Sequence, residues 1–522
     1  MAFYKKILFV GIIIIAILLS INWALNYWID RKLPEILSDK NKTPYHITFK
    51  DLDVDLWTGN CKAIGVTVVP KASLKGSLSK GGIYTNIEFI EIERINVFAA
   101  LFSDEIIAKR IKLIQPHINL YKKDAQAIKH IKSISKEIVE PFNKIITVSD
   151  IFIDKGDLKI IDLSKNLSIL NVENINLKIE GVLITEAILK KEIPFVYRKY
   201  MFSGTNFYYR ANKFYHLKAS SISNEKNNIM IKKFALVPEY GRRKFVRQLK
   251  KEKDLYNVEA NSIEIKNFFW GFKDEKIYFD VAAVVLNNVS ANIFRSKIPP
   301  DDMKKKRLYN SLLRSIPFPL KLDTLIVKNS RLVYEEEIDA KRGSGVVSFS
   351  KFNLNATHIE SGFGKKRMPD VRIRVNCRFM DFSPLRVNWS FNVLDKSDGF
   401  KIHGKILNFD TKRISTFFKP YMNMEAEGIF DEVNFNLTGN DHLSRGICEL
   451  KYHDFKMTIY KKRKPEKKSK LKTFVANLLI KDDSDGKNKK VAVEIKRIPE
   501  KSFYNFLWRS VVDGVKEVLL PL

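Results

Sequence analysis

The sequence predicts a mostly β protein with interspersed helices, in which an N-terminal transmembrane helix precedes an internally duplicated β region. Three observations give this prediction: one long apolar run near the start, alternation of apolar and polar residues along the rest of the chain, and recurrence of the same apolar spacing about 173 residues later. The chain has 522 residues, of which 45% are hydrophobic and 12% aromatic, so it can bury a large core.

The transmembrane helix is predicted from the apolar run between Ile7 and Ile29, which follows two lysines. A helix of 23 residues is long enough to cross a hydrocarbon core of about 30 Å. No small-residue cleavage pattern follows the run, whereas Trp23, Tyr27 and Trp28 suit the membrane–water interface. Residues 1–30 are therefore interpreted as an uncleaved signal anchor, with everything after them on one side of the membrane.

The strands are predicted from period-two alternation, which places apolar side chains on one face of each strand. The segments Ile47–Leu56, Ile87–Ile92 and Val491–Ile495 show this alternation. The aspartates that alternate with apolar residues in the first segment fit a solvated strand face better than a calcium loop, which would need Gly and Glu where Leu56 and Lys62 stand.

The duplication is predicted from a constant offset between matched apolar residues. Ile90 and Ile92 recur as Ile263 and Ile265 at an offset of 173, and Leu113 recurs as Leu286 at the same offset. A longer set recurs at an offset of 174, namely Val148, Ile151, Ile153, Leu158 and Ile160 as Leu322, Leu325, Val327, Leu332 and Tyr334. Chance alignment of alternating segments is the alternative explanation.

The repeat divides the chain after the anchor into two related units, residues 31–226 and 227–398, and a strand-rich tail, residues 399–522. Within the tail, residues 501–520 are predicted to form an amphipathic helix, because Phe503, Leu507, Val511 and Val515 recur at helical spacing. Helical interruptions are also expected at residues 124–144, 240–256 and 299–316.

Catalytic and metal-binding motifs are absent from the sequence. Cys61, Cys377 and Cys448 stand far apart, so neither a disulfide framework nor a structural zinc site is expected. The eight histidines form no HxH or HExxH pattern, and no GxSxG, Walker or GxGxxG signature occurs. We therefore expect no cofactor, no metal and no enzymatic activity, and we assign no catalytic residue.

The charge balance is strongly basic, with 91 Lys+Arg against 59 Asp+Glu and a net charge of +32. This excess favours acidic partners such as lipid headgroups, and compositional drift towards lysine is the alternative explanation. The basic runs at 242–244, 304–307 and 461–464 could contact phosphates or form solvated loops. Nucleic acid is not expected as a partner of a chain exported behind a membrane anchor.

Several segments resemble AsmA-like proteins, the bacterial envelope family that includes AsmA and TamB relatives. Residues 108–121 resemble a strand pair of that family, and residues 146–160 and 320–334 resemble its recurring hairpin. Four short segments, residues 400–405, 408–410, 424–428 and 437–439, resemble its C-terminal core. The resemblance covers nearly the whole chain, but its motifs are hydrophobic patterns with a few Gly, Pro and Asp markers. The chain departs from the family in its short length, its basic charge and the lack of a recognisable TamB C-terminal domain.

The resemblance implies a single inner-membrane helix that holds an elongated, curled β-sheet, or β-taco, in the periplasm of a Gram-negative bacterium. The inside of this groove would be apolar and would carry phospholipid acyl chains towards the outer membrane. On this interpretation the groove is lined by the repeated apolar residues of both units: Ile90, Ile92, Leu113, Val148, Ile151, Ile153, Leu158, Ile160, Ile263, Ile265, Leu286, Leu322, Leu325, Val327, Leu332 and Tyr334.

Two functional hypotheses follow from the sequence. The first is a membrane-anchored periplasmic protein that binds lipid acyl chains and supports phospholipid transport or outer-membrane biogenesis, with phospholipid, the inner membrane and other envelope proteins as partners. The alternative is a non-enzymatic scaffold for assembling outer-membrane proteins, in which the same apolar strand faces form a filled core. An envelope enzyme with an unrecognised site is a third, weaker reading.

Overall fold

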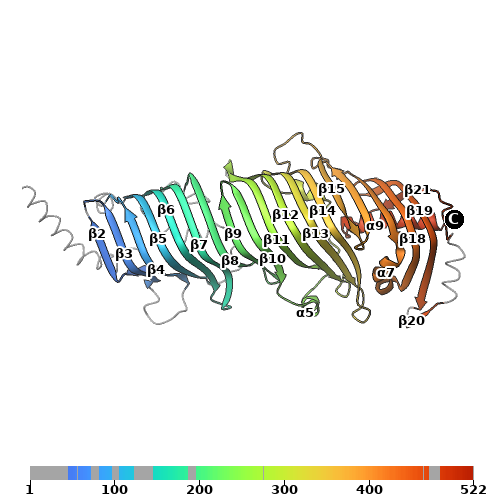
Figure 1. Ribbon diagram of the computed structural model, residues 1–522, viewed down its shortest axis with the longest axis horizontal. Coiled ribbons are helices and arrows are strands. Elements are labelled where there is room, and N and C mark those ends of the chain that lie inside the picture. Colours follow the sequence, from blue (N-terminus) through green and yellow to red (C-terminus); the bar gives the residue numbers. More distant parts are fainter. Residues whose placement is uncertain are drawn as a thin grey trace, which may run out of the picture. The chain divides into compact units, whose positions relative to one another are not determined.

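The computed structural model describes residues 45–55, 57–71, 81–96, 105–122, 145–185, 196–273, 276–461, 464–469 and 482–520. Within these residues the protein is mostly β, built as a curled and unclosed sheet with few helices, as the alternation predicts (Figure 1). The predicted transmembrane segment Ile7–Ile29 lies outside the described residues. None of the helices within them is long and apolar enough to cross a membrane.

The described residues fall into two compact units, which divide between residues 211 and 227. Unit 1 comprises the residues up to 211 together with 217–226, and unit 2 comprises residues 212–216 and those from 227 onward. Strand β9 (Tyr215–Glu225) contributes residues to both.

Unit 1 is a ladder of long strands. Strands β1 and β2 both pair with β3, and the ladder then runs in chain order from β3 to β8. Every pairing is antiparallel except β5–β6, which is parallel. The bounds are β1 (Tyr45–Thr48), β2 (Asp51–Asp55), β3 (Asn60–Pro70), β4 (Gly82–Glu93), β5 (Glu105–Lys122), β6 (Ile145–Asp162), β7 (Leu167–Ile184) and β8 (Lys199–Arg210).

Unit 2 continues the same construction. Its ladder runs in chain order from β10 to β19, after which β19 pairs with both β20 and β21. Only β12–β13 is parallel. The strand bounds are β10 (Asn228–Pro238), β11 (Asp254–Lys273), β12 (Lys276–Ser296), β13 (Leu320–Glu337), β14 (Ser344–Glu360), β15 (Val371–Phe379), β16 (Ser383–Phe391), β17 (Phe400–Asp410), β18 (Met424–Gly439), β19 (Leu443–Lys461), β20 (Lys464–Lys468) and β21 (Lys489–Lys496).

Among the residues of unit 2 that the structure describes, the helices are short except for the last one. They are α5 (Arg242–Arg247), α6 (Tyr309–Arg314), the 3₁₀ turn η3 (Thr411–Ile414), α7 (Ser415–Met422) and α9 (Phe503–Leu519). The side chain of Ser502 caps α9 by accepting a hydrogen bond from the Asn505 amide. The amphipathic helix expected at residues 501–520 is therefore present.

Two other expected helices are shorter than the sequence suggests. Of residues 240–256, only Arg242–Arg247 is helical, and β11 already begins at Asp254. Of residues 299–316, only Tyr309–Arg314 is helical, because the chain around the Pro299–Pro300 pair bonds to other segments: the Pro300 carbonyl accepts from Glu252 and the Lys306 amide donates to Pro499. The helix expected at residues 124–144 lies outside the described residues.

The connection between β12 and β13 explains why α6 exists. Two parallel neighbours in a sheet need a crossover that returns the chain along the length of the strand. Residues 297–319 make this return and carry α6 with them. The crossover thus brings Leu308 and Asn310 into the C-terminal core, where each is about 98–99% buried.

Candidate functional site

The residues predicted to line a groove lie in β4, β5 and β6 of unit 1 and in β11, β12 and β13 of unit 2. The strand registers join them into continuous rows that run across each ladder. We call the row through Ile90 the central row of unit 1, and its members are Ala63, Ile90, Leu113, Ile153, Leu177 and Phe202. The central row of unit 2 begins with Ile231, Ile263, Leu286, Val327 and Leu354.

The other predicted lining residues fall into neighbouring rows. Ile92 and Ile151 share a row in unit 1, as Ile265 and Leu325 share one with Val284 in unit 2. Leu158 pairs with Val172, Leu332 with Phe349, Val148 with Val182, and Leu322 with Ile359. Ile160 lies between Leu120 and Leu170, and its counterpart Tyr334 lies between Ile293 and Val347.

These rows are apolar but mostly not sealed. Among the predicted lining residues, Val148 and Ile160 are buried to 1% exposure, whereas the remaining fourteen are half-buried. Side chains in a packed core normally fall below a few per cent exposure, and the small clusters in this part of the sheet, such as Ala63, Val66 and Ile87, contain few residues. The rows therefore present aliphatic surface along the face of the ladder.

The two units repeat each other in backbone detail as well as in apolar spacing. The β6–β7 register shifts on either side of Gly156, and the β13–β14 register shifts on either side of Ser330, at an offset of 174. Left-handed residues recur at matching positions: Gln115 and Asn288, Lys155 and Asn329, and Asn174 and Lys351. Because positive φ is costly for residues other than Gly, its recurrence at matched sites indicates that both units bend in the same place.

The repeat also extends one strand further than the sequence comparison detects. Strands β3 and β10 each run from Asn to Pro over 11 residues, at an offset of 168. Their registers match, since Ala63 pairs with Ile90 and Ile231 pairs with Ile263. Gly65 in β3 has φ 61° and its counterpart Lys233 has φ 49°, so the same bend is made by different residue types.

The C-terminal part of unit 2 covers the same face with helices. The central row of unit 2 continues from Leu354 through Val375, Val387, Gly404, Phe435, Cys448 and Val491. Two core clusters form over this part, and they join strands β14–β19 to residues of α6, α7 and α9. A Cβ at Gly514 of α9 would lie 2.4 Å from the Cβ of Cys448, so the helix approaches β19 as closely as only glycine allows.

A polar strip borders the apolar rows where β11 begins and β12 and β13 end. The strip consists of charged residues on these three strands: the register places Asp254 of β11 beside Arg295 of β12, and Arg295 beside Glu336 of β13. Arg295 donates to both carboxylate oxygens of Asp254, at 2.6 and 2.9 Å. Tyr334 donates to Glu336, which is 9% exposed, and Tyr421 of α7 lies close enough to Glu336 to feel its charge. Burial, followed by the charge of Glu336, raises the pKa of Tyr421 to about 12.

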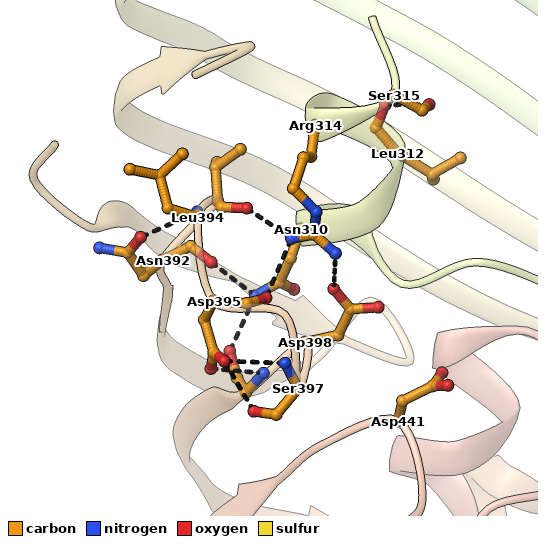
Figure 2. Close-up of polar contacts among 12 residues, drawn as sticks. Asn310, Leu312, Arg314, Ser315, Asn392, Leu394, Asp395, Ser397, Asp398 and Asp441 are labelled. Atoms are coloured by element: carbon orange, nitrogen blue, oxygen red, sulfur yellow. Dashed lines mark hydrogen bonds and ion pairs between the residues drawn. The ribbon is translucent and has the colours of Figure 1, made fainter. Parts of the chain in front are cut away.

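The crossover helix α6 is held by a second polar cluster, shown in Figure 2. The Asn310 amide donates to the carbonyls of Asn392 and Gly399, each at 2.9 Å. Arg314 donates to the carbonyls of Val393 and Asp395 and forms an ion pair with Asp398 at 2.7 Å. These bonds satisfy the backbone of the β16–β17 loop, so the cluster anchors the crossover and presents no free reactive group.

The described residues contain cysteines and carboxylates, the side-chain types that bind metals or act as nucleophiles. Among them, no group of three or more His, Cys, Asp or Glu side chains is arranged to hold a metal ion. Cys61, Cys377 and Cys448 are free thiols, and burial raises the pKa of each. A raised pKa disfavours the nucleophilic thiolate.

Sequence reasoning missed the polar strip and the helical cover. The strip could have been detected from Glu336, which stands at an inward position of the alternation in β13, and from Arg295, which does the same in β12. The helical cover could not have been predicted in the same way. The amphipathic pattern of α9 shows that one face of the helix packs on another element, but it does not show which strands that element comprises.

The described strands define a class of protein: two β-ladders that repeat each other, with apolar rows that are half-buried at most positions in β4–β6 and β11–β13 and are covered by α9 at β18 and β19. No family model matches the chain, and no curated protein matches it.

Proposed function

We propose that the open apolar rows bind the acyl chains of lipids and that the protein supports phospholipid transport or outer-membrane biogenesis from a membrane-anchored position in the periplasm. The observation that carries this proposal is a contrast along the rows: most row residues of β4–β6 and β11–β13, such as Leu113 and Val327, are half-buried, whereas Phe435 and Cys448 are buried where α9 packs on them. Contiguous apolar surface of this kind marks ligand-binding grooves or interaction sites.

The shape of the rows favours an elongated ligand. Neighbouring strands lie about 4.8 Å apart, so the six members of the central row of unit 1 extend over roughly 25 Å. An extended acyl chain of 16 to 18 carbons is of comparable length, at about 1.25 Å per carbon. Binding of an acyl chain requires no chemical reaction.

The scaffold hypothesis is the alternative, and one observation favours it for part of the chain. The C-terminal half of unit 2 has a filled core, with Leu437, Leu450 and Cys448 at 0–1% exposure. If the protein were a scaffold, lipid would be absent from the open rows as well.

The deciding experiment is mass spectrometry of lipids that copurify with the full chain, compared among variants. Ile153→Asp and Val327→Asp place a carboxylate at equivalent positions of the two central rows, and we expect each to reduce retained lipid while the protein stays folded. Lys159→Asp and Lys328→Asp are the matched controls, because both lysines are exposed on the same two strands. Absence of lipid from the parent protein, or equal loss in the controls, would contradict the proposal.

A further inference from the structure

The segment between β10 and β11 forms a compact basic projection, which we call the α5 lobe (residues 240–253). It is fixed to unit 2 by Phe245 of α5, which is fully buried against Tyr215, Leu255 and Phe294. Phe214 packs edge-on against Phe245 at 5.4 Å between ring centroids. The lobe is therefore an ordered surface rather than a solvated tail.

The lobe carries an extreme local charge. Its 14 residues include seven Lys or Arg and one acidic residue, Glu252. All seven basic side chains are exposed, whereas Glu252 is buried and bonded to Lys297. The acidic residue thus neutralises none of the exposed charge of the lobe.

Most of these cations have no carboxylate partner within the described part of the chain. Arg242 is paired with Glu335, and Lys251 approaches Asp302 at 3.6 Å. The remaining five form no ion pair with a described residue: Arg243, Lys244, Arg247, Lys250 and Lys253. Like charges this close repel one another, so their clustering costs free energy unless an anionic partner offsets it.

Aromatic rings lie beneath the same cations. The ammonium of Lys244 lies 5.0 Å from the centroid of Tyr240, and that of Lys253 lies 5.3 Å from the centroid of Phe214. Lys213 also stacks on Phe214, at 4.7 Å. Both rings are half-buried, so the lobe presents cations over partly accessible aromatic surface.

We propose that the α5 lobe docks on the surface of a bilayer that contains anionic phospholipids. Each Lys or Arg near such a surface contributes about 1 kcal/mol, and five unpaired cations are enough for measurable attachment. Amphipathic rings such as Tyr240 suit the headgroup level, where apolar and wet surroundings meet, and this favours a membrane over a nucleic acid duplex, whose backbone offers phosphates alone. The proposal does not rest on lipid binding by the apolar rows, since the lobe packs on the opposite strand face through Leu255 and Phe294.

The test measures co-flotation of the full chain, held in phosphatidylcholine nanodiscs, with vesicles of phosphatidylcholine that contain phosphatidylglycerol. We expect flotation with these vesicles but not with pure phosphatidylcholine vesicles, and a loss as salt rises. Arg243→Glu with Arg247→Glu should lower the floated fraction at least tenfold. Thermal unfolding and retained lipid should stay unchanged, because both arginines are exposed.

The matched control is Lys366→Glu with Arg367→Glu, which makes the same charge change in the exposed loop after β14. It should float as the parent does. An equal loss of flotation in both double variants would mean that only the net charge of the protein matters. Unchanged flotation of the α5 variant would mean that the lobe is not a docking surface. Either result overturns the proposal. Loss of binding to a single-stranded DNA probe with vesicle flotation intact would also overturn it, in favour of nucleic acid.

Discussion

Strands β10–β13 and strands β15–β19 of unit 2 belong to one ladder and share the same apolar rows. The two regions differ in how deeply the residues of these rows are buried. In the first region Ile263, Leu286 and Val327 remain half-buried, whereas in the second Phe435 and Cys448 lie under helices. The alternation that places these side chains on one face is the same in both. Whether a strand face becomes a core or a surface is thus decided by the segments that return over it, here the β12–β13 crossover and α9.

The strongest test of this difference places a carboxylate in each region. Leu437→Asp buries an unpaired charge at a position that is 1% exposed, and we expect the C-terminal core to unfold because the cost is several kcal/mol. Val327→Asp, at a half-buried position, should leave the unfolding temperature within a few degrees of the parent. Circular dichroism during heating measures both. Equal unfolding of the two variants would mean that the open rows are also a sealed core.

A second test compares two arginine ion pairs. Arg314→Ala removes the ion pair with Asp398 and two bonds to loop carbonyls, leaving Asp398, 7% exposed, without its guanidinium; we expect a loss of about 2–3 kcal/mol. Arg331→Ala breaks the exposed pair with Asp381 in the open region and should cost less than about 1 kcal/mol. Urea denaturation gives both values. A larger loss of unfolding free energy for Arg331→Ala than for Arg314→Ala would contradict this expectation. It would show that the ion pair in β13 stabilises unit 2 more than the contacts of α6 do.

The smallest effect concerns pH at the border between the two regions. The pKa of Tyr421 is raised from 10.0 to about 12, so the folded state holds this proton more tightly than the unfolded state does. Its contribution to stability is present below pH 10 and is lost as pH rises through about 12. Tyr421→Phe should therefore cost about 1 kcal/mol at neutral pH and weaken the decline between pH 10 and 12. An unchanged alkaline decline would show that other buried tyrosines, such as Tyr334, dominate it.

The periodicity of the sequence was sufficient to predict the strands and the matched rows, because alternation and constant offsets follow directly from strand geometry. The offset between Ile153 and Val327 even corresponds to the same register in both ladders. The β3–β10 match escaped detection, since its offset of 168 differs from the others and its bend uses Gly65 in one strand and Lys233 in the other. Helix length at residues 299–316 was wrong, because tertiary hydrogen bonds to Pro300 and Lys306 outweigh local helix signals.

The route of the β12–β13 crossover has a consequence for the order in which the chain is made. Leu308 and Tyr309 pack against Phe503 and Phe506 of α9, so two partners of one core are separated by nearly two hundred residues of sequence. At 5–20 residues per second, the ribosome needs on the order of 10 to 40 s between completing α6 and completing the first turn of α9. During that interval Leu308 can pack only against earlier members of its cluster, such as Val371 and Phe391, and the apolar surface that Phe503 and Phe506 cover in the final structure stays exposed. Because transiently exposed apolar surface promotes aggregation, we expect this part of the core to be the most prone to aggregate until α9 docks.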